Sequence, residues 1–158
     1  MTGLLVKQAG LLSSIQDLGR FGQHHIGLTT GGPLDKTAMT WANRLVHNGA
    51  QASALEISFG GLELESQVDT LVCVTGGDAA LSINGQDAET WRSHQLRCGD
   101  TLKLGFASKY CRSYLAVAGG FDVAPQFGST ATVVREGIGG LDGKKLTAGT
   151  VLSVTAQA

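Results

Sequence analysis

The sequence predicts a mainly β domain, either a barrel or a sandwich, with one long helix. Apolar and polar residues alternate over most of the chain beyond residue 54, which is the period of half-buried strands. The 23 glycines outnumber the 2 prolines, show no collagen repeat, and fall at strand ends where turns belong. With 158 residues, 42% of them hydrophobic, we expect a single domain over residues 1–158.

The N-terminal part of the chain predicts two strands and then the helix. Residues 3–8 and 11–15 read as the strands. Asp35 is placed to cap a helix, since its carboxylate can accept hydrogen bonds from first-turn amides. Asn48-Gly49 predicts the C-terminus of the helix, because both residues readily adopt the left-handed backbone that ends a helix. Between them, apolar residues recur on one helical face: Ala38, Trp41, Ala42, Leu45 and Val46.

The rest of the chain predicts strands joined by glycine turns. Residues 71–75 form a nearly continuous apolar run, as in a strand buried on both faces. Asn84-Gly85 is a strong hairpin signal after residues 81–83. Further strands are predicted at 55–59, 62–65, around 91–106, at 111–118 and at 146–154.

Charge and cysteine content exclude several classes of protein. The net charge is -1 and the basic residues are scattered singly, which argues against nucleic acid as a partner. Three cysteines without a C-x-x-C pair indicate reduced thiols. The N-terminus lacks the pattern of a signal peptide, and no apolar run is long enough to cross a bilayer. The reduced thiols and the missing signal peptide predict a cytoplasmic protein. The absence of a long apolar run predicts a soluble protein with no membrane partner.

The usual motifs for nucleotides, metals and hydrolytic nucleophiles are missing. Residues 139–145 suggest a phosphate loop, but Ile138 stands where glycine is needed, and Lys145 replaces the hydroxyl residue. His24 and His25 are adjacent and would point to opposite faces of a strand, so no metal site is predicted. Ser129 lies outside any G-x-S-x-G elbow. Two cysteines are predicted to be core thiols: Cys73 and Cys111.

The long glycine-rich loop over residues 16–35 is the candidate binding site. Such loops within a compact chain are usually binding surfaces or disordered inserts. In the functional interpretation, Arg20 receives a substrate carboxylate bidentately while Asp17 orients it. The amides of Gly31 and Gly32 would then face an oxyanion. The alternative is a local Asp17–Arg20 salt bridge that pins a turn, and both interpretations remain open.

Several motifs resemble a known family. They are GLLSSIQDLGR at 10–20, FGQHHIG at 21–27, GGPLD at 31–35 and RSYLAVAGG at 112–120. In order and combination they are similar to allophanate hydrolase subunit 2. That family is also called biotin-dependent carboxyltransferase or the C subunit of 5-oxoprolinase. The resemblance runs almost from end to end of the chain.

The resemblance implies a cyclophilin-like β-barrel that is the first half of a two-part chain. It also implies membership of a complex that opens 5-oxoproline to glutamate at the expense of ATP, with 5-oxoprolinase subunits B and A as partners. ATP would be consumed by the complex, although this chain has no phosphate-loop motif, and the chain alone is expected to be inactive.

The expected site residues all come from the glycine-rich loop. Asp17 and Asp35 are the candidate catalytic residues. Two alternative functions stay open: biotin-dependent carboxyl transfer to a urea-like amide, and non-enzymatic regulation of a partner by docking. The candidate substrate-binding residues are Gln16, Arg20, His24, Gly31 and Gly32.

Overall fold

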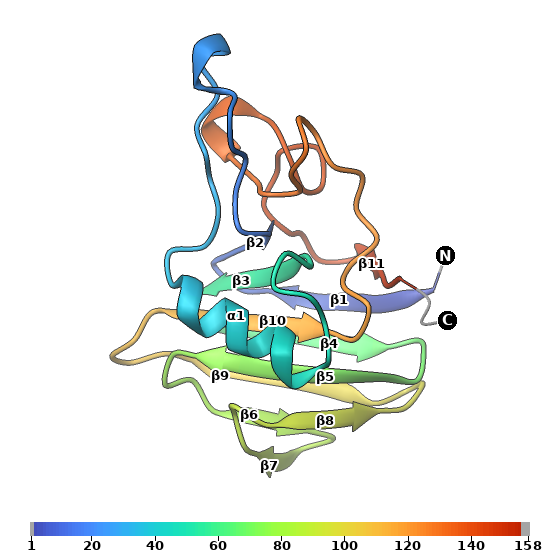
Figure 1. Ribbon diagram of the computed structural model, residues 1–158. Helices are drawn as coiled ribbons and strands as arrows, with labels where there is room; N and C mark the ends of the chain where they lie inside the picture. Colours follow the sequence, from blue (N-terminus) through green and yellow to red (C-terminus); the bar gives the residue numbers. More distant parts are fainter. Residues whose placement is uncertain (1, 156–158) are drawn as a thin grey trace.

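Two antiparallel β-sheets pack around a shared core, and one helix covers the outside of the second sheet (Figure 1). The computed structural model describes residues 2–155. The predicted mainly β fold with one long helix is confirmed. No helix in that part of the chain is long and apolar enough to cross a membrane.

The first sheet has six strands and contains the N-terminal strand. Asn84 and Gly85 turn its last hairpin with φ angles of 52° and 77°, as the sequence predicts. In spatial order its strands are β11 (Val151–Ser153), β1 (Gly3–Ala9), β4 (Gly60–Ser66), β9 (Thr101–Phe106), β6 (Leu81–Ile83) and β7 (Gln86–Ala88).

The second sheet has five strands, and two adjacent interior strands, at residues 112–117 and 70–76, are buried on both faces. One face meets the first sheet and the other meets the helix, which explains the continuous apolar runs in the sequence. In spatial order the strands are β2 (Leu12–Gln16), β3 (Ala54–Ser58), β10 (Arg112–Val117), β5 (Thr70–Gly76) and β8 (Ser93–Leu96).

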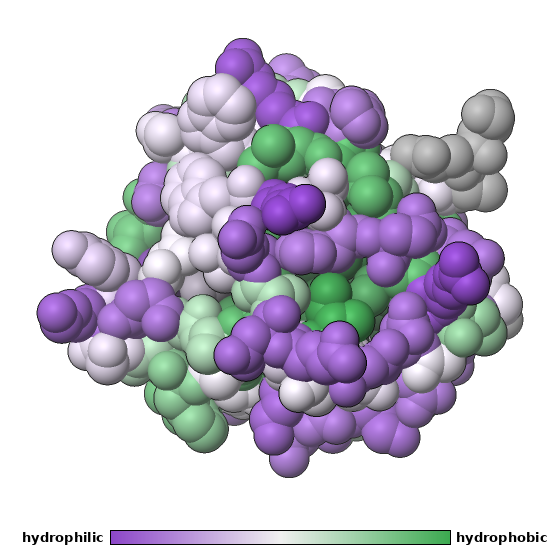
Figure 2. All heavy atoms as spheres, turned by 90° about the horizontal axis from the view of Figure 1, so that it is seen from below, coloured by the Kyte–Doolittle hydropathy of each residue, from purple (hydrophilic) through white to green (hydrophobic). Residues whose placement is uncertain are grey.

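The main core lies between the sheets and is built from leucine, isoleucine and valine. Leu4, Leu62 and Leu115 are among its fully buried members. At the end of the molecule that carries β6, β7 and β8, Figure 2 shows hydrophilic residues interspersed with apolar ones. The strands of the first sheet thus turn alternate apolar side chains inward, as the two-residue period requires.

Helix α1 (Lys36–Leu45) begins where the sequence predicts, but one residue of the predicted buried face is exposed. The Asp35 carboxylate accepts from the Ala38 amide at 3.0 Å, so Asp35 is the N-cap. Trp41, predicted in the buried stripe, is 45% exposed, because it lies at the edge of the stripe with the Arg44 guanidinium over its ring.

The helix also ends earlier than Asn48-Gly49. His47 takes the left-handed backbone position, with φ of 63°. The Asn48 side chain is used elsewhere: it donates to the Val117 carbonyl at 2.8 Å and accepts from the Gly119 amide at 2.8 Å. The helix C-terminus is therefore tied to the end of β10.

Two irregular segments project together from one end of the sheets (Figure 1). The first is the glycine-rich loop, which contains the short 3-10 helix η1 (His24–Ile26). The second runs from residue 119 to 150 and contains η2 (Val134–Glu136). Their contacts build the site described next.

Candidate functional site

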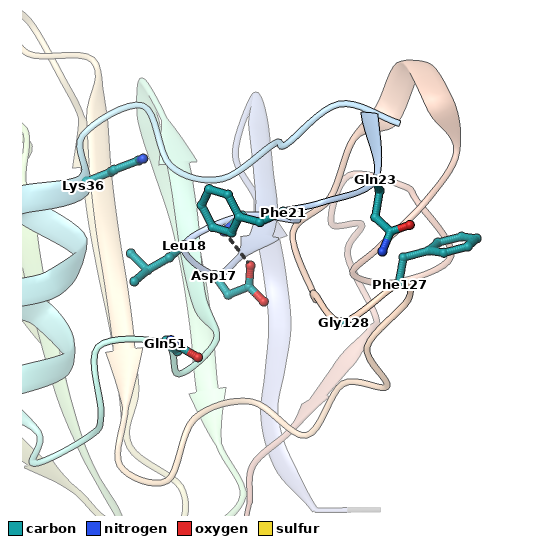
Figure 3. Close-up of a pocket in the computed structure, with 9 residues that line it drawn as sticks. Asp17, Leu18, Phe21, Gln23, Lys36, Gln51, Phe127 and Gly128 are labelled. Atoms are coloured by element: carbon teal, nitrogen blue, oxygen red, sulfur yellow. Dashed lines mark hydrogen bonds between the residues drawn. The ribbon is translucent and has the colours of Figure 1, made fainter. Parts of the chain in front are cut away.

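A pocket of about 650 Å³ lies between the glycine-rich loop, the start of α1 and residues 127–128. Figure 3 shows Lys36 and Gln51 on one side, Gln23 and Phe127 on the other, and Asp17 between them. A pocket of this size suits a small ligand. Its walls are made by Asp17, Leu18, Gly19, Phe21, Gln23, Lys36, Gln51, Phe127 and Gly128.

Asp17 lines this pocket, but hydrogen bonds already occupy its carboxylate. One oxygen accepts from the Gly19 amide at 2.9 Å and from the Ser129 hydroxyl at 2.5 Å. The other accepts from the Thr130 amide at 2.7 Å and from the Thr130 hydroxyl at 3.2 Å. Asp17 therefore holds residues 129–130 against the glycine-rich loop, and Ser129 is its partner.

Arg20 is 1% exposed and is not among the residues that line the pocket. Its Nε donates to the Gln126 carbonyl at 2.8 Å, and its Nη2 donates to the carbonyls of Ser129 and Ala131 at 3.0 Å each. No ion pair joins it to Asp17 within the described residues. The geometry thus supports neither a substrate contact nor the local salt bridge: Arg20 fixes the segment 126–131, of which Phe127 and Gly128 line the pocket.

The other predicted substrate-binding residues lie outside the pocket lining. Gln16 is 5% exposed, and its amide nitrogen donates to the Ser14 hydroxyl and the Thr132 carbonyl. Gly31 and Gly32 both have left-handed backbones, with φ of 64° and 92°. A side chain at Gly32 would come within 3.0 Å of the Leu18 carbonyl, so glycine serves close packing there.

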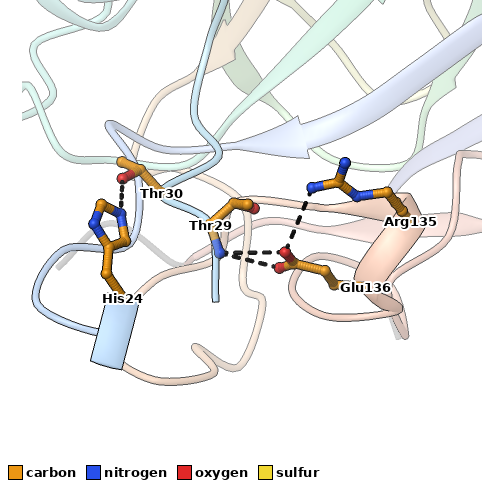
Figure 4. Close-up of polar contacts among 5 residues, drawn as sticks. All are labelled: His24, Thr29, Thr30, Arg135 and Glu136. Atoms are coloured by element: carbon orange, nitrogen blue, oxygen red, sulfur yellow. Dashed lines mark hydrogen bonds and ion pairs between the residues drawn. The ribbon is translucent and has the colours of Figure 1, made fainter. Parts of the chain in front are cut away.

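His24 lies at the outer tip of the glycine-rich loop. Its Nε2 is 3.0 Å from the Thr30 hydroxyl. Figure 4 shows the two side chains pointing toward one another. Next to it, the Thr29 amide donates to the Glu136 carboxylate at 3.2 Å. The tip is therefore joined to η2, and His24 itself does not line the pocket.

Asp35 sits beside a buried tyrosine and a glutamate on the other side of the α1 N-terminus. Its amide donates to the Tyr114 hydroxyl at 2.8 Å, and that hydroxyl donates to Glu56 at 2.8 Å. Burial raises the pKa of Tyr114 far above its ordinary value, so the hydroxyl keeps its proton. The network anchors the end of the glycine-rich loop to β3 and β10, and it does not bring Asp35 to Asp17 in one pocket.

The pocket contains residues that sequence reasoning missed. Lys36 is exposed at the first position of α1, and within residues 2–155 its ammonium has no carboxylate partner. Gln51 and Phe127 come from loops far away in the chain. Lys36 had one sequence signal, since it follows the predicted N-cap directly. A cation at the positive end of a helix macrodipole favours a negatively charged ligand.

The cysteines fall into different environments. Cys73 is fully buried, and this burial raises its pKa to about 11, so the prediction of a core thiol is confirmed. Cys111 is only partly buried and its sulfur is 3.2 Å from the Arg112 Nη1, so the same prediction is wrong for Cys111. It precedes β10 at a strand end that opens on a second pocket.

The fold and the pocket define a β domain with one helix and a cavity of small-molecule size at the helix N-terminus. Residues 26–158 match the family described as "Carboxyltransferase domain, subdomain A and B", and the chain belongs to this family. It is 38% identical over 151 residues to the 5-oxoprolinase C subunit of Escherichia coli, covering 96% of this chain and 49% of that protein. It is 34% identical to the urea amidolyase of Saccharomyces cerevisiae, covering 96% of this chain and 8% of that protein.

Solved structures show the same fold. The crystal structure of the K. lactis urea amidolyase superposes with a TM-score of 0.94 at 33% identity, over 97% of this chain and 9% of that one. The chain spans about half the length of the 5-oxoprolinase relative and less than a tenth of the urea amidolyases. The relatives thus share this domain within longer proteins.

Proposed function

We propose that the chain works in a cytoplasmic enzyme complex that opens 5-oxoproline to glutamate with consumption of ATP, and that the pocket beside α1 binds the substrate. The identity to the C subunits of two bacterial 5-oxoprolinases supports the complex, and the partners would be 5-oxoprolinase subunits B and A. ATP would bind outside this chain, which has no phosphate-loop motif.

The observation that carries this proposal is the chemistry of the pocket. The Lys36 ammonium, without a carboxylate partner in the described residues, would bind the substrate carboxylate. The primary amides of Gln23 and Gln51 can both donate to the lactam oxygen and accept from the lactam N–H. Phe21 and Phe127 would cover the apolar ring carbons.

In the reaction, the lactam C–N bond breaks as water adds a hydroxyl to carbon and a proton to nitrogen. Asp17, whose oxygens each accept two hydrogen bonds, acts as a positioning residue that fixes the pocket wall. The two glutamine amides hold the lactam while the Lys36 ammonium holds the carboxylate, and together they orient the lactam carbonyl for attack. Nucleotide chemistry would be supplied by the partner subunits.

The test is the Lys36→Ala variant in the complex reconstituted with subunits B and A. Loss of one charge-assisted contact predicts a KM for 5-oxoproline raised by about tenfold or more. Lys145→Ala is the matched control, since Lys145 is also exposed and lies outside the pocket. An unchanged KM in Lys36→Ala would refute the assignment of this contact.

The urea amidolyase relatives support a second candidate, biotin-dependent carboxyl transfer to a urea-like amide. Urea carries no carboxylate, so Lys36→Ala would change its binding little, whereas the glutamine amides would still be needed. Avidin sensitivity of the assembled activity distinguishes the two reactions. Inhibition by avidin would favour carboxyl transfer, and insensitivity would remove it.

A further inference from the structure

A second pocket lies on the other side of the α1 N-terminus and shares no lining residue with the first. Its volume is about 470 Å³. It is formed where the loop before β10 faces the loop before β8, and the glycine pair at 76–77 forms part of its wall. None of the chemistry proposed above uses this pocket.

Two partly exposed aromatic rings line the second pocket. Trp91 is 47% exposed and Tyr110 is 67% exposed. Trp91 has a left-handed backbone with φ of 60°, which is unusual for a bulky residue, and its amide donates to the Val74 carbonyl at 2.7 Å. The backbone thus holds the indole at the pocket, although its apolar surface is not used by the core.

Two cations line the same pocket. Lys109 and Arg112 form no ion pair with any carboxylate in the part of the chain that the structure describes. The Arg112 guanidinium lies over the Phe59 ring at 5.9 Å, and its Nη1 contacts the Cys111 sulfur at 3.2 Å. These contacts orient the guanidinium and leave it without a countercharge.

One carboxylate also lines the pocket, and it is occupied. Asp35 accepts from the Ala38 amide at 3.0 Å as the helix cap. The lining therefore holds two positive charges against one negative charge. An anion is favoured at the wall formed by residues 109–112, away from the helix cap.

The wall that carries the cations is preorganised. Asp78 accepts from the amide and hydroxyl of Ser108 at 2.9 and 2.6 Å, and from the Lys109 amide at 3.1 Å. The loop is therefore fixed before any ligand binds, which lowers the entropic cost of binding.

We propose that this pocket is a second ligand site and that it takes a planar aromatic carboxylate. The aromatic ring would pack against Trp91 and Tyr110, and the carboxylate would bind Arg112 and Lys109. Aromatic packing supplies affinity, and a guanidinium recognises a carboxylate by paired hydrogen bonds.

The experiment uses 2-naphthoate as the probe and the uncharged 2-naphthamide as its comparison. Cys111 lies in the pocket and reports occupancy through its rate of alkylation by iodoacetamide, measured by mass spectrometry. Cys98 is exposed outside the pocket and is the internal control. As a second readout, Trp41→Phe leaves Trp91 as the remaining one of the 2 tryptophans, so that its fluorescence reports binding directly.

We expect 2-naphthoate to slow alkylation of Cys111 but not of Cys98, and to change the fluorescence of Trp91. Lys109→Gln and Arg112→Gln should each weaken the affinity by about tenfold, whereas Arg97→Gln, an exposed arginine outside the pocket, should not. Lys109 is exposed, so its variant tests the charge without disturbing packing. Equal binding of 2-naphthamide, or no response of either reporter to 2-naphthoate, would overturn the proposal.

Discussion

Replacement of Arg20 by alanine is the sharpest test of how the pocket wall is built. The side chain is fully buried and donates to three backbone carbonyls, at positions 126, 129 and 131. Three hydrogen bonds from a charged donor, at about 1.5–3 kcal/mol each, give an upper figure of about 4.5–9 kcal/mol. Desolvation of the guanidinium offsets part of this, so we expect a net loss of about 3–5 kcal/mol in the free energy of unfolding.

The assay is urea denaturation, supported by thermal denaturation. A loss of that size predicts a Tm lower by about 6–20 °C for a domain of this length. Arg20→Lys should retain part of the stability, because one ammonium can still reach some of the carbonyls. Lys36→Ala is the contrasting variant: Lys36 is exposed, and we expect its change to stay within about 0.5 kcal/mol.

Unfolding of Arg20→Ala at the same urea concentration as the unmodified chain would contradict this role of Arg20. Loss of substrate affinity in that variant with unchanged stability would contradict it equally. Either result would mean that the guanidinium serves a ligand and not the wall.

Three further changes test the surroundings of the site. Tyr114→Phe removes a hydroxyl that bonds both Asp35 and Glu56, and should cost about 1–3 kcal/mol in urea denaturation. Asp35→Ala removes the helix cap and should cost about 0.5–2 kcal/mol, while Asp35→Asn should retain most of the stability; equal losses in both would argue against capping. Hydrogen bonds lower the pKa of Asp78 to about 2 from 3.8, and the bond from the Ser108 hydroxyl has a larger effect than the bond from the Lys109 amide. Its contribution to stability is therefore complete above pH 3.8 and declines as the pH falls toward 2, so Asp78→Asn should show a shallower loss of Tm over that range.

Periodicity was sufficient to predict most of the fold. The alternating strands and the Asn84-Gly85 turn depend on local chemistry, and the structure has them near the predicted positions. The prediction that Trp41 is buried was wrong, because residue spacing does not define where the apolar face of a helix ends. The exposure of a residue at that boundary depends on what packs beside it.

The site was only partly predictable, since its walls come from distant segments. Asp17 does line the pocket, but Gln51 and Phe127 reach it through packing that no local pattern encodes. Arg20 lies in a loop without periodicity, so the sequence does not tell whether its guanidinium points inward or outward. Its partners are more than 100 positions away in the chain.

That separation has a consequence for biosynthesis. Arg20 and Asp17 are translated more than 100 residues before the groups that satisfy them, which lie at positions 126–131. Until those residues emerge, the two charged side chains lack their long-range partners, and long-range pairing of this kind slows folding. A nascent chain stalled before residue 126 should therefore keep this region open to proteases, and protection should arrive in one step once residues 126–131 have emerged.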